Sequence, residues 1–252
     1  MRGNPIGGKT ALVTGAAKRI GRAIALAFSD EGVNVVVHYN SSEDEAKQLV
    51  AEIERRAVKA WPVQADLARP EETETLIDRA LKIAGPIEIL VNNASIFPGE
   101  KLDELSSESF AKNMQVNAWA PFVLARAFAR RVGRGKIINL EDSRTAGYDW
   151  NHVGYILSKH VLAVFTKMMA VEYAPDIAVN AVRPGLILPP PGKDESYIDR
   201  LTGTVPLKRH GDPKDIADAV VFLAKSDFIT GEVIYVDGGR HLKEYTDGQN
   251  PD

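Results

Sequence analysis

The fold is decided near the start of the chain, by residues 9–32: KTALVTGAAKRIGRAIALAFSDEG. Residues 9–14 form a short apolar run that predicts a buried strand. Ile20, Ile24, Ala27 and Phe28 then recur at the spacing of one helix face. Gly32 follows at once, where glycine commonly ends a helix. The stretch therefore predicts a strand, a glycine-containing turn and a helix.

The same alternation of strand and helix patterns continues along the chain. Further strands are predicted at residues 33–38, 60–65, 87–93, 136–140, 177–182 and 232–236. Several of these runs are apolar almost throughout, which is typical of strands buried on both faces of a parallel sheet. Repeated strand–helix units predict the α/β class, with a Rossmann-type doubly wound parallel sheet of about seven strands and helices on both faces.

We find no linker between two such arrays, so the sequence predicts one domain over residues 1–252, with its core at 9–241. Residues 186–205 interrupt the rhythm with proline, glycine and charge. Because they follow a strand end, where α/β folds bind ligands, we predict a loop with a short helix that covers the substrate; a disordered insert is the alternative. Residues 242–252 are expected to form a polar tail.

Composition excludes several classes of protein. The 252 residues carry 31 Lys and Arg against 34 Asp and Glu, a formal charge of −3, which argues against a nucleic-acid partner. The absence of cysteine excludes disulfides and thiolate chemistry. No apolar run approaches the roughly 20 residues of a membrane span, and MRGNPIGGKT lacks the apolar stretch of a signal peptide, so we expect a cytoplasmic protein. The histidines have no metal-binding spacing, so no metal is expected.

The turn after the first predicted strand is suited to a phosphate group. Gly15 permits a tight turn, and the first helix begins close to Lys18, Arg19 and Ile20. Free backbone N–H groups and the helix dipole at such a place hold anions. The motif lacks the middle glycine of GxGxxG, so an ordinary strand–helix turn is the alternative.

The end of the second predicted strand favours NADP(H) over NAD(H). NAD-binding proteins usually place an acid about 20 residues beyond the glycines, but here the second predicted strand is followed by His38, Tyr39, Asn40, Ser41 and Ser42, with no acid until Glu43. A 2′-phosphate would instead meet the cations and hydrogen-bond donors of Lys18, Arg19, His38, Asn40, Ser41 and Ser42. The two serines could also cap the helix that follows them.

Tyr155 and Lys159 lie at positions i and i+4 of a helix pattern at about 151–174, so they share one face. A neighbouring ammonium favours the phenolate, which predicts a lowered pKa for Tyr155 and a role in proton transfer. A surface tyrosine with a solvated lysine is the alternative.

Six motifs in order carry a resemblance to a known family. They are TGAAKRIG (14–21), Asp66 in QADL, NNAS (92–95), Asn117 in VNAWAPF, YILSK (155–159) and RPG (183–185). So spaced, they resemble the short-chain dehydrogenase/reductase family over about residues 9–241. The resemblance implies that Tyr155 donates a proton, that Lys159 binds the cofactor ribose and lowers the tyrosine pKa, and that Asn117 holds a relay water. It also implies further contacts with the cofactor, from Asp66 and Leu67, Asn93, Ala94 and Ser95, and Pro184, Gly185 and Leu186.

Departures from the family pattern narrow the prediction. The family's usual catalytic serine, thirteen residues before the tyrosine, is Asp142 here, although a one-residue slip would restore Ser143. Together with Arg19 in place of a glycine, NNAS in place of NNAG, HYNSS after the second strand and Phe97, this resembles the pteridine reductase branch. The substrate residues so implied are Arg19, Ser95, Phe97, Asp142 and Tyr155. Loop packing of Phe97, and a helix cap or an Arg144 salt bridge for Asp142, are the structural alternatives.

We therefore predict an NADPH-dependent reductase that reduces the C=N bond of a dihydropterin, a pterin or dihydrofolate. A buried Asp142 would have a raised pKa and could accept or relay protons of the pterin. A carbonyl reductase acting on a 3-oxoacyl thioester is the first alternative, and a non-catalytic NADP(H) sensor the second. The family likeness further implies a homo-oligomer, a tetramer or dimer, packed through the helix at 151–174.

Overall fold

The computed structural model describes residues 6–190 and 192–244. Its seven strands lie close to the predicted ranges: β1 Thr10–Val13, β2 Asn34–Tyr39, β3 Ala60–Gln64, β4 Ile89–Asn92, β5 Gly135–Leu140, β6 Ile177–Pro184 and β7 Val233–Val236. All pair in parallel in one sheet of order β3-β2-β1-β4-β5-β6-β7. The predicted doubly wound sheet is confirmed.

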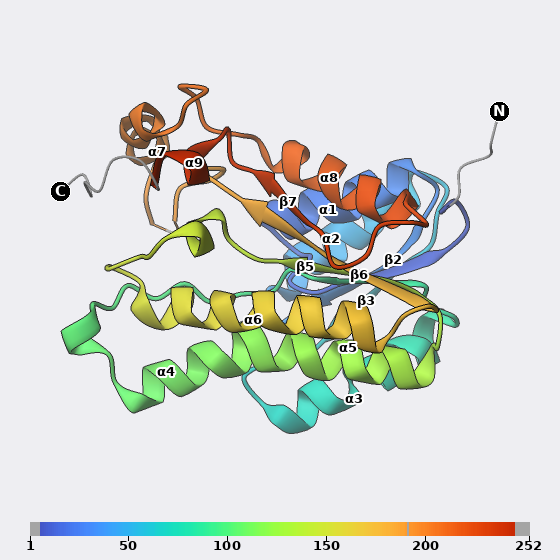
Figure 1. The fold of residues 1–252 in the computed structure, drawn as a ribbon. Helices are drawn as coiled ribbons and strands as arrows, with labels where there is room; N and C mark the ends of the chain where they lie inside the picture. Colours follow the sequence, from blue (N-terminus) through green and yellow to red (C-terminus); the bar gives the residue numbers. More distant parts are fainter. Residues whose placement is uncertain (1–5, 191, 245–252) are drawn as a thin grey trace.

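Two layers of helices cover the sheet (Figure 1). On one face lie α1 Arg19–Asp30, α2 Glu43–Glu54 and α8 Pro213–Lys225, whose apolar sides pack into one core cluster. On the other lie α3 Pro70–Ala84, α4 Ser107–Met114, α5 Ala120–Arg131 and α6 Val153–Glu172, and α3, α5 and α6 contribute to a second cluster. Because both faces are covered, β1 and β4 are buried along their whole length, whereas the edge strands β3 and β7 stay partly exposed.

The predicted helix patterns form as expected. Ile24 and Phe28 of α1 are fully buried, and Gly32 follows the helix with φ +74°, a left-handed conformation that glycine adopts without strain. Ala46, Leu49 and Ile53 give α2 its buried stripe. The helix predicted at about 151–174 is α6, which begins and ends within two residues of that range.

The segment predicted to cover the substrate contains α7 Glu195–Leu201 and a 3₁₀ helix Thr202–Thr204, so it holds the predicted short helix; residue 191 lies outside the described residues. The predicted polar tail begins too early, because residues 242–244 belong to α9 Arg240–Glu244; residues 245–252 lie outside the described part. Among the described residues, no helix combines the length and apolar character that crossing a membrane requires.

Candidate active site

The turn after β1 is packed too tightly for side chains at its glycines. A Cβ on Gly21 would lie 2.2 Å from the Gly15 carbonyl oxygen and 2.6 Å from Asn93 Nδ2. Asn93 Nδ2 donates to the carbonyls of Thr14 at 2.8 Å and Gly15 at 3.2 Å. Asn93, at the end of β4, thus supports the turn after β1. Helix α1 begins beside this turn, and the N–H groups of its first turn have no partner within the helix. This arrangement fits a pyrophosphate.

Arg19 takes a left-handed backbone conformation, which glycine adopts more readily than other residues. Its φ is +56°, which costs a non-glycine residue roughly 1 kcal/mol. Its guanidinium reaches across the site and donates to the Pro189 carbonyl oxygen at 2.8 Å. Arg19 therefore joins the phosphate turn to the predicted covering loop.

His38 does not face the place expected for a 2′-phosphate, which corrects the sequence prediction. Its ring is buried, with Nδ1 accepting from the Gly15 N–H at 3.0 Å and Nε2 lying 3.0 Å from the Ala65 carbonyl oxygen. Burial lowers its pKa from 6.5 to about 4. A neutral imidazole that bonds at both nitrogens braces the glycine turn and supplies no positive charge.

This burial predicts an acid-sensitive fold. Between pH 6.5 and 4 the unfolded state binds a proton at His38 that the folded state excludes, so the free energy of unfolding falls as pH falls. The loss should be about 1.4 kcal/mol per pH unit in the middle of that window. Denaturant titrations of the ligand-free protein and of His38→Gln, at pH 7, 6, 5 and 4.5, measure it. A stability difference between the two that stays constant with pH would contradict the assignment.

The other expected 2′-phosphate residues remain at the surface beside the turn. Lys18 pairs with Glu45 at 2.6 Å, Asn40 lies 3.5 Å from Asp66, and Ser42, directly before α2, makes no side-chain cap among the described residues. A groove of about 520 Å³ opens here, lined by α1 and α2 side chains that include Lys18, Arg19 and Arg22. Cations and hydrogen-bond donors therefore lie near the end of β2, although Glu45 and Glu52 in the same groove pair with Lys18 and Arg22.

Two further groups of residues expected beside the cofactor lie at or directly after the ends of β3 and β6. Leu67 is buried after β3, while Asp66 accepts from the Ala68 N–H at 3.0 Å. Pro184 ends β6, and a Cβ on Gly185 would lie 2.4 Å from the Asp237 side chain. The Leu186 carbonyl then accepts from the Gly211 N–H at 2.9 Å. The geometry fixes the backbone of these positions.

Helix α6 delivers Tyr155 and Lys159 into the site, both buried. Lys159 Nζ donates to the Leu140 carbonyl oxygen at 2.7 Å and lies 5.6 Å from the centre of the Tyr155 ring. Burial lowers the pKa of Lys159 to about 8. The predicted pair is therefore not a solvated surface pair, and its ammonium lies against the end of β5.

Asp142, and not Ser143, faces the tyrosine. Tyr155 donates its hydroxyl hydrogen to Asp142 Oδ2 at 2.7 Å. Asp142 also caps the 3₁₀ helix Ser143–Ala146 through the Arg144 N–H at 2.8 Å, and it pairs with the Arg144 guanidinium at 3.1 Å. Both structural alternatives for Asp142 are thus realised together with the contact expected of a catalytic group.

Two expected pKa shifts have the opposite sign. Burial would raise the pKa of Asp142, but the charge and hydrogen bonds of Arg144 outweigh burial and hold it below its usual value. Burial, followed by the Asp142 charge, raises the pKa of Tyr155 well above 10, whereas the sequence predicted lowering by Lys159. The ligand-free site therefore holds a carboxylate and a neutral phenol.

Asn117 anchors the loop after β4. It lies in a π-helix, Gln115–Trp119, between α4 and α5, and is fully buried. Its Oδ1 accepts from the Ile96 N–H at 2.9 Å and from Ser95 Oγ at 3.0 Å, and its Nδ2 donates to Ser158 Oγ at 3.0 Å. The side chain thereby fixes Ser95 beside α6, a task that the sequence did not predict.

Phe97 lies edge-on to Tyr155, with 4.6 Å between ring centroids. It stacks on His152 at 3.8 Å, and the Arg144 guanidinium lies 4.8 Å from its ring centre. Asp149 binds both Arg144 and His152. Asp149 and His152 were missed by the sequence analysis, because no spacing relates them to Asp142 before the loop between β5 and α6 is folded.

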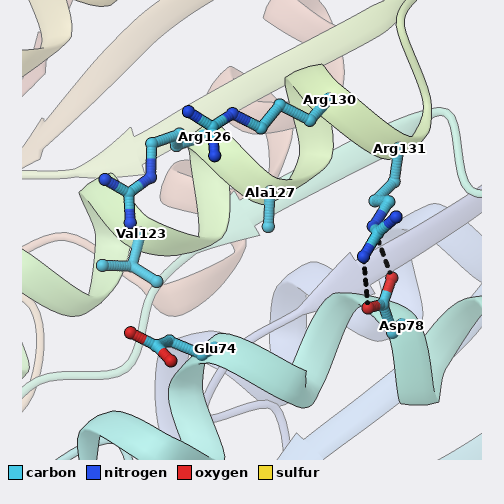
Figure 2. Close-up of a pocket in the computed structure, with 7 residues that line it drawn as sticks. All are labelled: Glu74, Asp78, Val123, Arg126, Ala127, Arg130 and Arg131. Carbon is cyan, nitrogen blue, oxygen red and sulfur yellow. Dashed lines mark hydrogen bonds and ion pairs between the residues drawn. The ribbon is translucent and has the colours of Figure 1, made fainter.

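A second groove lies far from these residues, between α3 and α5 (Figure 2). It measures about 380 Å³, and Arg126, Arg130 and Arg131 extend along α5, with Arg131 paired to Asp78 of α3 at 2.9 Å. Arg130 and Arg131 lie in the last turn of α5, where cations are favourable.

Comparisons with known proteins agree with the fold. The family model described as Enoyl-(Acyl carrier protein) reductase matches residues 15–241. The chain is 35% identical to the 3-oxoacyl-[acyl-carrier-protein] reductase FabG of Staphylococcus epidermidis over 93% of this chain and 99% of that protein. The FolM alternative dihydrofolate reductase 1 of Brucella canis, complexed with NADP, has 32% identity and a TM-score of 0.88, covering 94% and 96%. The angucycline C-6 ketoreductase LanV with bound NADP has 33% identity and the same TM-score, covering 94% and 97%.

Proposed function

The chain belongs to the short-chain dehydrogenase/reductase family, and we propose that it is an NADPH-dependent reductase of dihydropterin-type substrates, dihydrofolate included. The proposal rests on one observation: a buried carboxylate, Asp142, accepts the hydroxyl hydrogen of Tyr155 at the position where the family usually has a serine. The structural likeness to FolM alternative dihydrofolate reductases, at 32–33% identity, supports the same substrate class.

A carboxylate at this position suits a pterin better than a ketone. A pterin carries N–H donors around its ring, and an ionised carboxyl group is purely an acceptor. A ketone oxygen would be repelled by the carboxylate and would compete with it for the Tyr155 hydrogen. Phe97 lies edge-on to Tyr155, but His152 stacks on its ring and the Arg144 guanidinium lies over it, so a flat substrate ring would have to displace one of these side chains to stack there.

The residues present fit NADP(H). The glycine turn leaves no room for a Cβ at Gly21, α1 opens beside it, and the end of β2 presents donors without a carboxylate before Glu43. When bound, NADPH supplies the hydride. Lys18, Asn40 and Ser42 would hold its 2′-phosphate end, and Lys159 its ribose.

The reaction needs a hydride on the carbon of the C=N bond and a proton on its nitrogen. Tyr155 provides the proton from its hydroxyl group, whose raised pKa keeps it protonated at neutral pH. An N–H of the substrate replaces that hydroxyl as the donor to Asp142, which frees Tyr155 to turn toward the nitrogen. Lys159, already charged and buried, offsets the negative charge left on the tyrosine oxygen.

Carbonyl reduction is the second candidate. It is favoured by the 35% identity to a 3-oxoacyl-[acyl-carrier-protein] reductase and by the likeness to the ketoreductase LanV. Tyr155 would then protonate a carbonyl oxygen, and Asp142 would have to move away from it or be protonated.

Homo-oligomer formation stays a prediction as well: Val164, Met168 and Val171 of α6 are exposed apolar residues that a second copy could cover.

NADPH oxidation, followed with dihydrobiopterin, dihydrofolate and a 3-oxoacyl thioester in parallel, tests the proposal. We expect turnover with at least one pterin at a kcat/KM well above that with the thioester. Turnover of the thioester without turnover of either pterin would favour the second candidate. Binding of NADPH without oxidation by any of the three would favour the non-catalytic alternative.

A further inference from the structure

Arg144, beside Asp142, makes more contacts than the two partners of a simple surface ion pair do. Arg144 donates to Asp142 from its backbone N–H at 2.8 Å, from Nε at 3.1 Å and from Nη2 at 3.1 Å. Its Nη1 binds Asp149 on the other side. The guanidinium also lies 4.8 Å from the ring centre of Phe97 and 5.6 Å from that of Tyr155. One cation thus contacts two carboxylates and two aromatic rings of the site.

We propose that Arg144 is the positioning residue of this site: held by Asp149, it fixes Asp142 as an oriented hydrogen-bond acceptor and thereby selects substrates that present an N–H group. The proposal rests on the proposed function for the identity of the substrate. Its core, the action of Arg144 on Asp142, concerns the protein alone.

The geometry leaves Asp142 little freedom. Two of the Arg144 bonds reach Oδ1 and one reaches Oδ2, so the carboxylate is held at both oxygens. The same Oδ2 accepts from Tyr155. Arg144 is itself fixed, because Asp149 is anchored by the Asn151 and His152 N–H groups at 2.9 and 3.1 Å. The orientation of Asp142 therefore depends on a chain of contacts that ends in the loop before α6.

Arg144 also outweighs the burial of Asp142. Among the described residues, the ionisable groups around this carboxylate include Glu141 and Arg144 on its own segment, Asp149 and His152 in the following loop, and Tyr155 and Lys159 on α6. Helix α9, which carries Arg240 and His241, packs against the 3₁₀ helix that contains Arg144. Glu141 is engaged elsewhere, bound by Arg183 at 2.7 Å. Lys159 donates to the Leu140 carbonyl. Arg144 is the cation that contacts Asp142 directly, and without it burial would favour the protonated, neutral acid.

The consequence for substrates follows from hydrogen bonding. An ionised, fixed Asp142 accepts hydrogen bonds but cannot donate them. It therefore favours binding of a substrate that presents an N–H group and disfavours binding of a carbonyl oxygen at the same place. A protonated Asp142 would donate to a carbonyl oxygen as well as the family's usual serine does. The charge state set by Arg144 therefore separates reduction of a C=N bond from reduction of a ketone at the same tyrosine.

The test changes the side chain of Arg144 and leaves Asp142, Asp149 and Tyr155 in place. Arg144→Gln removes the cation, Arg144→Lys retains it without the forked geometry, and Arg131→Gln removes an arginine from the exposed pair with Asp78 as a matched control (Figure 2). Carboxyl ¹³C signals of the ligand-free protein are titrated, with the Asp142 signal assigned by its loss in Asp142→Asn. The pH profile of kcat/KM for dihydrofolate is measured in parallel.

We expect the Asp142 midpoint to rise in Arg144→Gln by at least about one pH unit, to rise less in Arg144→Lys, and to stay unchanged in Arg131→Gln. In Arg144→Gln, kcat/KM relative to the parent should fall about tenfold for each pH unit below the raised Asp142 midpoint, and the gap should close above that midpoint as Asp142 ionises again. Because Arg144→Lys keeps the charge, it gives a second reading if Arg144→Gln fails to fold.

An unchanged Asp142 midpoint, or an activity loss that is uniform across pH, would overturn the proposal. Its failure is distinguishable from failure of the proposed function. If the parent does not turn over pterins but the Asp142 midpoint still rises in Arg144→Gln, the action of Arg144 on Asp142 stands and the substrate assignment falls. If pterins turn over but the Asp142 midpoint is unchanged in Arg144→Gln, the substrate assignment stands and the action of Arg144 on Asp142 is wrong.

Discussion

Tyr155→Phe should reduce turnover of the best substrate on the order of 10²–10⁴-fold, because it removes the proton donor and nothing else. The phenol hydrogen donates to Asp142 at 2.7 Å, and Asp142 keeps its bonds to Arg144 when that hydrogen is lost. The ring itself is buried against Phe97, and a phenylalanine retains its shape. Steady-state NADPH oxidation gives the size of the loss.

Two controls accompany this variant. NADPH affinity, measured by fluorescence, should change by less than about threefold, because the hydroxyl is one contact among many. The midpoint of thermal unfolding should stay close to that of the parent. Turnover within a few-fold of the parent, with binding intact, would show that the proton comes from another group.

Asp142→Ser should reverse the order of substrates. The serine restores the family's usual hydroxyl, which can donate to a carbonyl oxygen but removes the carboxylate that accepts from a pterin N–H. Loss of a charged hydrogen bond corresponds to about 1.5–3 kcal/mol, so kcat/KM for dihydrofolate should fall on the order of 10- to 100-fold. Activity with a 3-oxoacyl thioester should stay constant or rise.

Asp142→Asn is the matched control, since it keeps the size of the side chain and removes the charge. It should lose pterin activity as Asp142→Ser does, without gaining thioester activity to the same extent. Both variants remove the Asp142 charge that helps to raise the pKa of Tyr155, so this pKa should decrease toward its ordinary value. It should stay above that value, because the hydroxyl remains buried. Tyrosinate absorbance reports this shift. Pterin activity retained in both would remove the role assigned to Asp142.

The fold could be predicted from sequence because its signals are local and repeated. Apolar runs such as VNVVVH at 33–38 identify strands buried on both faces, and β2 begins and ends one residue away from that range. The interval of thirteen residues to Tyr155 put Asp142, not Ser143, in register without a gap, and the structure shows that contact. Helix spacing alone brought Tyr155 and Lys159 to one face.

The electrostatics of the site could not be predicted in the same way. The pKa of Tyr155 depends on which charge is nearest, and Asp142 contacts its hydroxyl while Lys159 bonds to the Leu140 carbonyl. A histidine at the end of the second strand could bind a phosphate group, as far as its residue type shows. Its ring is instead buried by contacts with Gly15 in the turn after β1 and with Ala65 after β3, which are distant from it in sequence. Such contacts exist only after the strands have paired.

The contact between Arg19 and the Pro189 carbonyl has a consequence for biosynthesis. The two residues are separated by 170 positions, so the contact cannot form until most of the chain has left the ribosome. β1, which occupies a central place in the sheet, must likewise wait for β4 to cover its second edge. Non-local pairing of this kind is slow. A nascent chain stalled before β6 would therefore carry the phosphate turn in sequence but lack a closed site, and would be unable to gain stability from the nucleotide.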